Sequence, residues 1–121
     1  MPRTVLVVDD SVTIRQMVSF TLKEAGFTVL EAIDGQDALQ RLGSGRVDLV
    51  VTDLNMPRMD GITLIRALRG RSTTRSTPVL MLTTESQESK RQEGRAAGAT
   101  AWIVKPFHPD RLLQVIAKVL P

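Results

Sequence analysis

Several residues that could do chemistry each follow a short apolar run of this sequence. Asp9 and Asp10 come directly after one such run, and Asp53, Thr83 and Lys105 come after three others. Three carboxylates brought together repel one another, so at neutral pH they must be protonated, paired with a cation or bound to a metal. Oxygen ligands without Cys or His suit Mg²⁺, Mn²⁺ or Ca²⁺, and Mg²⁺ typically takes one or two carboxylates, several waters and a phosphate oxygen. A metal ion beside a free carboxylate, an ammonium and a hydroxyl would make a phosphoryl-transfer site.

These residues can act together only if the fold brings the ends of the apolar runs to one place. The runs are short and rich in β-branched residues, and between them apolar positions recur every three or four residues, as in strands that alternate with helices. The pattern predicts strands at residues 4–8, 27–32, 48–52, 79–82 and 101–104, and helices at 11–25, 35–42, 62–68, 86–97 and 109–120. Such alternation implies an α/β doubly wound fold, with a five-stranded parallel sheet and five helices on its two faces. Ligands bind at the carboxyl ends of the strands in these sheets, so the chemical residues are predicted to converge there.

The first predicted helix has sequence signals for both of its ends and for its buried face. Ser11 is a candidate N-cap, and Gly26 is a candidate for the position after the last helical residue, because glycine readily adopts positive φ. The spacing of three and four predicts one buried face made of Ile14, Met17, Val18, Thr21, Leu22 and Ala25.

The overall composition excludes several classes of protein. The chain has 121 residues, 42% of them hydrophobic, which is enough for one core and predicts a single domain spanning residues 1–121 with no output domain. There is no apolar run long enough to span a bilayer and no secretory signal, and Cys is absent, so we expect a cytoplasmic protein. The net charge of +3 comes from scattered Arg residues without an aromatic platform, so we expect no nucleic acid partner. The densest basic group is predicted to be a solvated helix end and loop: Arg66, Arg69, Arg71 and Arg75.

Each chemical residue also has an ordinary structural explanation. A lone Asp after a strand is usually the N-cap of the next helix, a lone Lys-Pro is usually a turn, and a lone Thr there is usually satisfied by backbone. These explanations do not easily account for the pair Asp9–Asp10 together with Asp53, Thr83 and Lys105 at successive strand ends.

The same residues lie in motifs of a known family. The chain resembles the receiver domain of two-component response regulators over essentially its whole length, in the segments LVVDDS, VVTDLNMPRMDG, MLTTES and GATAWIVKPF. The resemblance implies a flavodoxin-like (CheY-like) fold with strand order 2-1-3-4-5. The residues around Thr83 and Lys105 are most similar to the single-domain chemotaxis regulators.

The resemblance implies a role for each site residue. Asp53 would accept a phosphoryl group from a sensor histidine kinase. Mg²⁺ would be held by Asp10, Asp53 and the backbone carbonyl of Asn55, with Asp9 acting directly or through water. Lys105 would pair with one phosphoryl oxygen, the Thr83 hydroxyl would move to bond another, and Lys105–Pro106 would be a cis peptide. The chain would be a phosphoacceptor that assists its own phosphorylation and dephosphorylation, and not a turnover enzyme.

Trp102 departs from the family pattern, which has Tyr or Phe three residues before the lysine. We expect Trp102 to act as a switch residue with a smaller population shift; the alternative is a partly exposed aromatic residue on an edge strand. An output face is predicted to carry Arg91, Arg95, Trp102 and Lys118, suited to an acidic amphipathic helix. By resemblance the partners are a chemotaxis-type histidine kinase, the flagellar motor switch protein and in some cases a phosphatase, and the chain is expected to be a monomer.

Three alternatives stay open at this stage. An aspartate-based phosphatase also uses a strand-end Asp with Mg²⁺, but it typically has a second Asp two residues later, where this chain has Asn55. A receiver-like module could bind partners without phosphorylation, although such modules commonly lose one of the acidic residues or the lysine. A receiver could also serve as a phosphate sink or relay instead of binding the motor.

Overall fold

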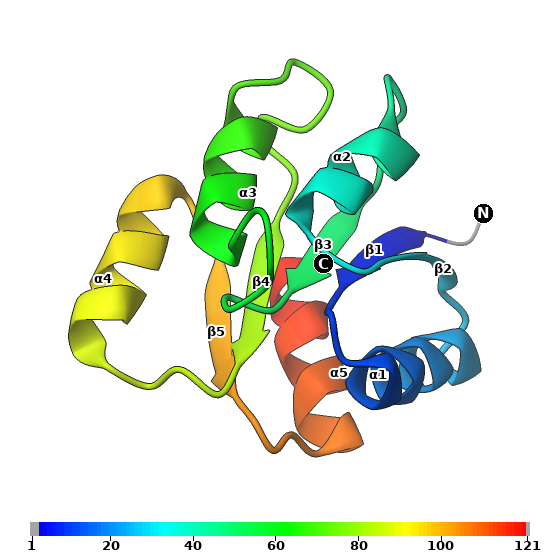
Figure 1. Ribbon diagram of the computed structural model, residues 1–121. Helices are drawn as coiled ribbons and strands as arrows, with labels where there is room; N and C mark the ends of the chain where they lie inside the picture. The colour runs from blue at the N-terminus through cyan, green and yellow to red at the C-terminus, as the bar shows by residue number, and fades with distance from the viewer. Residues whose placement is uncertain (1–2, 121) are drawn as a thin grey trace.

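The computed structural model describes residues 3–120, in which strands and helices alternate along the chain (Figure 1). The strands are β1 (Thr4–Val8), β2 (Thr28–Ala32), β3 (Leu49–Thr52), β4 (Val79–Thr83) and β5 (Ala101–Val104). The helices are α1 (Val12–Glu24), α2 (Gly35–Leu42), α3 (Gly61–Arg69), α4 (Glu88–Ala97) and α5 (Pro109–Val119). In residues 3–120 no helix has the length and apolar character that crossing a membrane would require.

The strands form one parallel sheet in the order β2-β1-β3-β4-β5, which confirms the expected fold. Helices α1 and α5 cover one face, and α2, α3 and α4 cover the other (Figure 1). Val8 at the end of β1 pairs with Thr52 at the end of β3, and Thr83 at the end of β4 pairs with Val104 at the end of β5. β1 and β3 therefore end level with each other, as do β4 and β5, and β4 runs past the end of β3 because Thr52 pairs with Met81.

The core consists of two apolar layers, one on each side of the sheet. Alternate residues of a strand point to opposite faces, so Leu6 and Val8 pack toward α2 and α3, whereas Val5 and Val7 pack toward α1 and α5. All four side chains are at most 1% exposed. The central strands must therefore be apolar at nearly every position, and a polar residue first becomes tolerable where such a strand ends.

Helix α1 confirms its predicted ends but not its whole predicted face. The Ser11 side chain accepts a hydrogen bond from the Ile14 N–H at 3.3 Å, and Gly26 follows the helix with φ of 96°. Met17 and Ala25 were predicted to be buried, but 49% of Met17 is exposed, and Ala25 is exposed too. Successive residues are about 100° apart around a helix, so the side chain that precedes buried Val18 points away from the sheet.

Helix α4 begins at Glu88, two residues after its predicted start. Its N-cap residue Gln87 makes no side-chain capping bond, and Gly94 is its one buried residue. A helix with so little apolar burial depends on contacts beyond its own sequence. It ends at Ala97, as predicted, and Gly98 follows with φ of 118°.

Arg69 contradicts the expectation of a solvated basic loop. Its guanidinium donates hydrogen bonds to the carbonyls of Thr74, Arg75 and Thr77 at 3.1, 3.2 and 2.6 Å and to that of Gly98 at 2.8 Å. Burial lowers the pKa of Arg69 from its ordinary value. Arg69 thus joins the end of α3 to the loop before β4 and to the end of α4, a role that its position among other arginines did not reveal.

Candidate functional site

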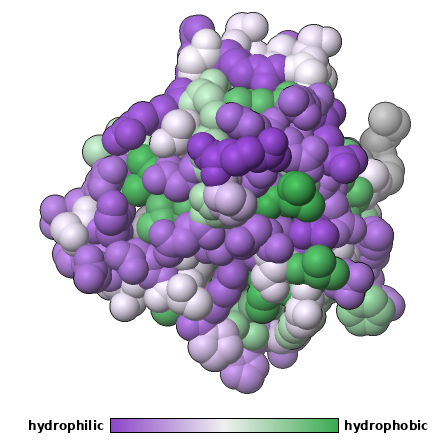
Figure 2. All heavy atoms as spheres, viewed as in Figure 1, coloured by the Kyte–Doolittle hydropathy of each residue, from purple (hydrophilic) through white to green (hydrophobic). Residues whose placement is uncertain are grey.

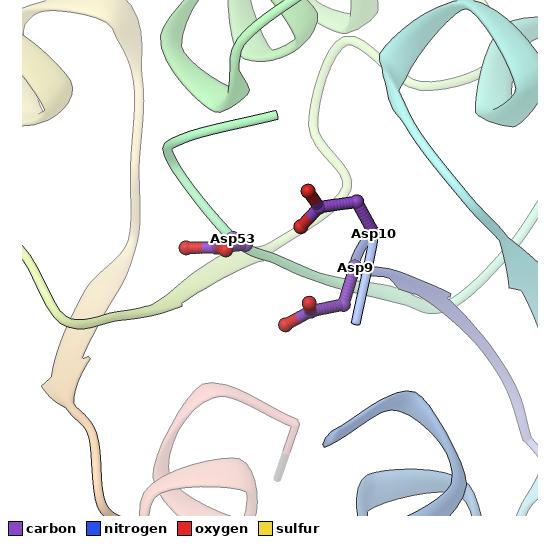
Figure 3. A group of neighbouring side chains, drawn as sticks. All are labelled: Asp9, Asp10 and Asp53. Carbon is purple, nitrogen blue, oxygen red and sulfur yellow. The ribbon is translucent and has the colours of Figure 1, made fainter. Parts of the chain in front are cut away.

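The three predicted aspartates lie together where β1 and β3 end (Figure 3). One carboxylate oxygen from each of Asp9, Asp10 and Asp53 lies within 4.8 Å of the others. The Asp53 N–H donates to the Val8 carbonyl at 2.9 Å, which extends the pairing of the two strands by one residue. The convergence predicted from the sequence therefore follows from the register of two neighbouring parallel strands.

The three carboxylates differ in their environments. Asp9 and Asp53 are buried, with exposures of 3% and 8%, whereas Asp10 is exposed. Burial raises the pKa of Asp9, and the hydrogen bonds from Lys105 and from the Ser11 N–H oppose that rise. Negative charge is thus costly at the inner end of the cluster, and a cation bound there is favoured.

Lys105 supplies one cation to this cluster. Its ammonium lies 2.8 Å from Asp9 Oδ2 and 3.4 Å from Asp53 Oδ2. Lys105 follows β5, and the Lys105–Pro106 peptide is cis, as expected. One ammonium, beside two of the three carboxylates, leaves an excess of negative charge in the cluster.

Thr83 ends β4, the strand between β3 and β5, and it is fully buried. Its hydroxyl accepts a hydrogen bond from the Glu85 N–H at 3.3 Å, and its carbonyl accepts one from the Lys105 N–H at 2.8 Å. The hydroxyl is therefore bonded to the β4–α4 loop, and the carbonyl of Thr83 holds the backbone of Lys105 beside the end of β4.

The β3–α3 loop, residues 53–60, borders the aspartate cluster, because it begins at Asp53. The Leu54 N–H donates to Asp53 Oδ1 at 2.7 Å, and the Gly61 N–H donates to the Leu54 carbonyl at 2.8 Å. A Cβ at Gly61 would collide with the Asp53 carbonyl oxygen, so this close return of the chain requires glycine. Asn55 lies in this loop and is exposed.

Trp102 is a partly exposed aromatic residue on the edge strand β5, and its side chain is nonetheless held by specific contacts. Its indole N–H donates to the Glu85 carbonyl at 3.0 Å, and a Cβ added at Gly94 would lie 2.7 Å from its Cζ3 atom. Trp102 therefore links β5 to the β4–α4 loop and to α4. With Arg91 and Arg95 it lines a small pocket, and Lys118 is exposed on α5 outside that lining.

Two arginines near the site were missed by sequence reasoning. Arg15 donates to the Asp9 carbonyl at 2.7 Å and pairs with Glu31 at 3.1 Å. Arg58 pairs with Asp34 at 2.6 Å. These partners are 16 and 24 residues apart and come from different elements, so no local spacing signals them.

The cluster suits a small, hard cation. Its donors are carboxylate oxygens; two of the three carboxylates are buried, and exposed Asp10 leaves one side open to water and ligand. Mg²⁺ has this preference for a few carboxylates combined with waters and phosphate oxygens. The chemistry of the donor set therefore fits the predicted metal.

Comparison with known proteins agrees with the site. A family model described as the response regulator receiver domain matches residues 5–117. The chemotaxis protein CheY of Pseudomonas aeruginosa is 42% identical over 116 residues, which cover 95% of this chain and 94% of that protein. The phosphate regulon transcriptional regulatory protein PhoB of Escherichia coli is 40% identical over 120 residues, 99% of this chain but 52% of that protein. A crystal structure of Vibrio cholerae chemotaxis protein CheY4 is 49% identical, with a TM-score of 0.95 over 99% of this chain and 100% of that one. This chain is a CheY-like member of the response regulator receiver domain family.

Proposed function

We propose that the protein accepts a phosphoryl group on Asp53, with Mg²⁺ bound by Asp9, Asp10, Asp53 and the Asn55 carbonyl. The observation that carries the proposal is the set of three carboxylate oxygens within 4.8 Å of one another, with the Lys105 ammonium beside two of them. A structural cluster would gain nothing from so much like charge at neutral pH, whereas a site for a metal and a phosphoryl group needs it.

In the proposed reaction a phosphoryl group moves from a nitrogen atom to a carboxylate oxygen. An Asp53 oxygen attacks phosphorus, and the bond from phosphorus to the histidine nitrogen of a sensor kinase breaks, leaving that nitrogen with the electron pair and a proton from solvent. Mg²⁺ bound by the acidic cluster would offset charge on the transferring oxygens. The Lys105 ammonium, which lies 3.4 Å from Asp53 Oδ2, would pair with a phosphoryl oxygen from the β5 side.

Phosphorylation would alter the contacts of Thr83. Its hydroxyl accepts from the Glu85 N–H, and it would turn to donate to a phosphoryl oxygen instead. The loop that carries Glu85 is also held by the Trp102 N–H. A change at Thr83 is therefore passed to Trp102, α4 and β5, which makes Trp102 the switch residue.

The first test is intact mass after incubation with acetyl phosphate, with and without Mg²⁺. We expect one added phosphoryl group that depends on Mg²⁺ and is absent from Asp53→Asn. The matched control is Asp48→Asn, because Asp48 precedes β3 and lies at the opposite end of that strand. Addition to Asp53→Asn, or none to the wild type, would contradict the proposal.

The proposed output is phosphorylation-dependent binding of a flagellar motor switch protein, through the face that carries Trp102, Arg91 and Arg95. The similarity to two chemotaxis proteins, over 94% and 100% of their lengths, favours this output. We expect acetyl phosphate with Mg²⁺ to tighten binding of purified motor switch protein, and Arg95→Glu to weaken it. Arg46→Glu, an exposed charge before β3 that does not line the pocket of Trp102 and Arg95, should leave it unchanged. Equal affinity with and without phosphorylation would favour the phosphate-sink or relay role.

A further inference from the structure

The backbone at Arg58 has a conformation that its side chain does not favour. Its φ is 67°, in the left-handed region, and among the described residues it is the one non-glycine position with positive φ. Residues held in such conformations persist where surrounding contacts enforce them, and they cluster at functional sites. Arg58 lies in the loop between Asp53 and Gly61, which is also the loop of Asn55.

The contact that holds Arg58 is an ion pair with Asp34. Arg58 Nε and Nη2 both donate to Asp34 Oδ2, at 2.8 and 2.6 Å, while Oδ1 of the same carboxylate accepts the Asp37 N–H at 2.8 Å. The Asp34 side chain is 2% exposed and that of Arg58 is 53% exposed. One buried carboxylate therefore caps α2 and anchors the β3–α3 loop at the same time.

A second contact reinforces this anchor. A Cβ added at Gly35 would lie 2.8 Å from both Cγ and Sδ of Met59, so the Met59 side chain lies directly on the first residue of α2. Two consecutive loop residues are thus fixed to α2, and the hydrogen bond between Gly61 and Leu54 closes the base of the loop. What remains between these attachments is the stretch that carries Asn55.

We propose that Asp34 and Arg58 are positioning residues that hold the β3–α3 loop in its metal-binding form, so that the Asn55 carbonyl is in place before Mg²⁺ arrives. The inference rests on the proposed function, since it concerns the same metal site. Without the ion pair the backbone at residue 58 is no longer held in this conformation, and the loop that supplies the carbonyl becomes free to move. Fixing a ligand in advance raises affinity because less freedom is lost on binding.

The test is thermal unfolding of the full chain, first in chelator and then at increasing Mg²⁺ concentrations. The melting temperature in chelator measures stability alone, and its rise with Mg²⁺ measures affinity, because a ligand that binds only the folded state stabilises it. The decisive variant is Arg58→Gly, which removes the ion pair and also relieves the unfavourable φ. We expect its melting temperature in chelator to stay close to that of the wild type and its Mg²⁺ affinity to fall about tenfold.

Further variants separate positioning from stability. Asp34→Asn keeps a good N-cap but loses the charge that holds Arg58, so we expect a similar loss of Mg²⁺ affinity. If Arg58→Gly fails to fold, the Mg²⁺ affinity of Asp34→Asn decides whether the ion pair positions the loop. Arg58→Lys keeps the charge with a single donor group and should restore part of the affinity. Arg41→Gln breaks the surface pair of Arg41 with Asp37, also on α2, and should leave the affinity unchanged.

The outcomes distinguish this inference from the proposed function. Wild-type Mg²⁺ dependence in both Arg58→Gly and Asp34→Asn would overturn the positioning role and leave the metal site intact, provided that Asp10→Asn abolishes the dependence. A wild-type chain that Mg²⁺ does not stabilise, and that behaves like Asp10→Asn, would overturn the metal site and this inference with it.

Discussion

The indole N–H of Trp102 donates a hydrogen bond to the backbone carbonyl of Glu85 at 3.0 Å. Tryptophan needs a partner for this group when it is partly buried, and here the partner is the loop that follows β4. The same ring lies against Gly94 of α4, where a larger residue would displace it. The indole ring of Trp102, which is wider than the ring of Tyr or Phe, is accommodated by Gly94 and by the Glu85 carbonyl that accepts its N–H.

Trp102→Phe removes the donor and keeps most of the aromatic surface. We expect a loss of about 1 kcal/mol in the free energy of unfolding, measured by urea titration, because one partly buried hydrogen bond is lost. We also expect a smaller difference in partner affinity between the phosphorylated and unphosphorylated forms. If Trp102→Ala leaves the affinity unchanged in both forms, Trp102 has no part in switching.

Gly61→Ala tests the close return of the β3–α3 loop. Its Cβ would collide with the carbonyl oxygen of Asp53, a backbone atom that cannot move without shifting the site. We expect a loss of about 1–3 kcal/mol in stability and weaker phosphorylation by acetyl phosphate. Gly70→Ala is the control, because its Cβ would meet nothing closer than the Ala67 carbonyl oxygen at 3.6 Å. Equal effects of the two substitutions would argue against the steric explanation.

Arg69→Met keeps an apolar stem but removes the donors that serve four carbonyl groups. We expect stability to fall by about 2 kcal/mol, because these groups lose their partner at a half-buried position. Hydrogen exchange should rise at the end of α4, where the Gly98 carbonyl is released. Arg71→Met is the matched control in the same basic segment, and a loss of stability as large as that of Arg69→Met would show that the bonds of Arg69 are not the cause.

The Asp34 carboxylate predicts how stability depends on pH. Burial alone would raise its pKa, but the Asp37 N–H and the Arg58 guanidinium outweigh burial and lower the pKa below its usual value of 3.8. A group whose pKa is lower in the folded state stabilises the fold above its unfolded pKa, and this contribution is lost as pH falls below about 3.8. We therefore expect urea titrations from about pH 5 to about pH 3 to show a shallower loss of stability in Asp34→Asn than in the wild type. Parallel curves would contradict this assignment.

Lys105→Met removes the ammonium that lies between Asp9 and Asp53. In chelator at neutral pH we expect lower stability, because three carboxylates then repel one another without a protein cation, and Mg²⁺ should restore part of it. Phosphorylation by acetyl phosphate should slow by about 100-fold, since the proposed reaction loses the cation that would offset charge on the transferred oxygens. Mass spectrometry over time measures the rate, and an unchanged rate would remove Lys105 from the reaction.

Much of the architecture was determined by the sequence itself. Strand and helix periods depend on neighbouring residues, so every element was predicted and most ends agree within one residue. The convergence of Asp9, Asp10 and Asp53 was predictable too, because parallel strands place their carboxyl ends at one edge of the sheet. Residue patterns along the chain were sufficient to predict features that depend on neighbouring residues.

The tertiary structure alone decided how the site is supported. Arg58 meets Asp34 across 24 residues, and Trp102 meets Glu85 across 17. Arg69, which was expected to be solvated, bonds across 29 residues to Gly98. Such contacts depend on how helices and loops pack against the sheet, which depends on all the elements together. The sequence thus determined which groups meet at the ends of the strands, whereas packing between distant elements decided how they are held, because a side chain's distant partners do not appear in its local spacing.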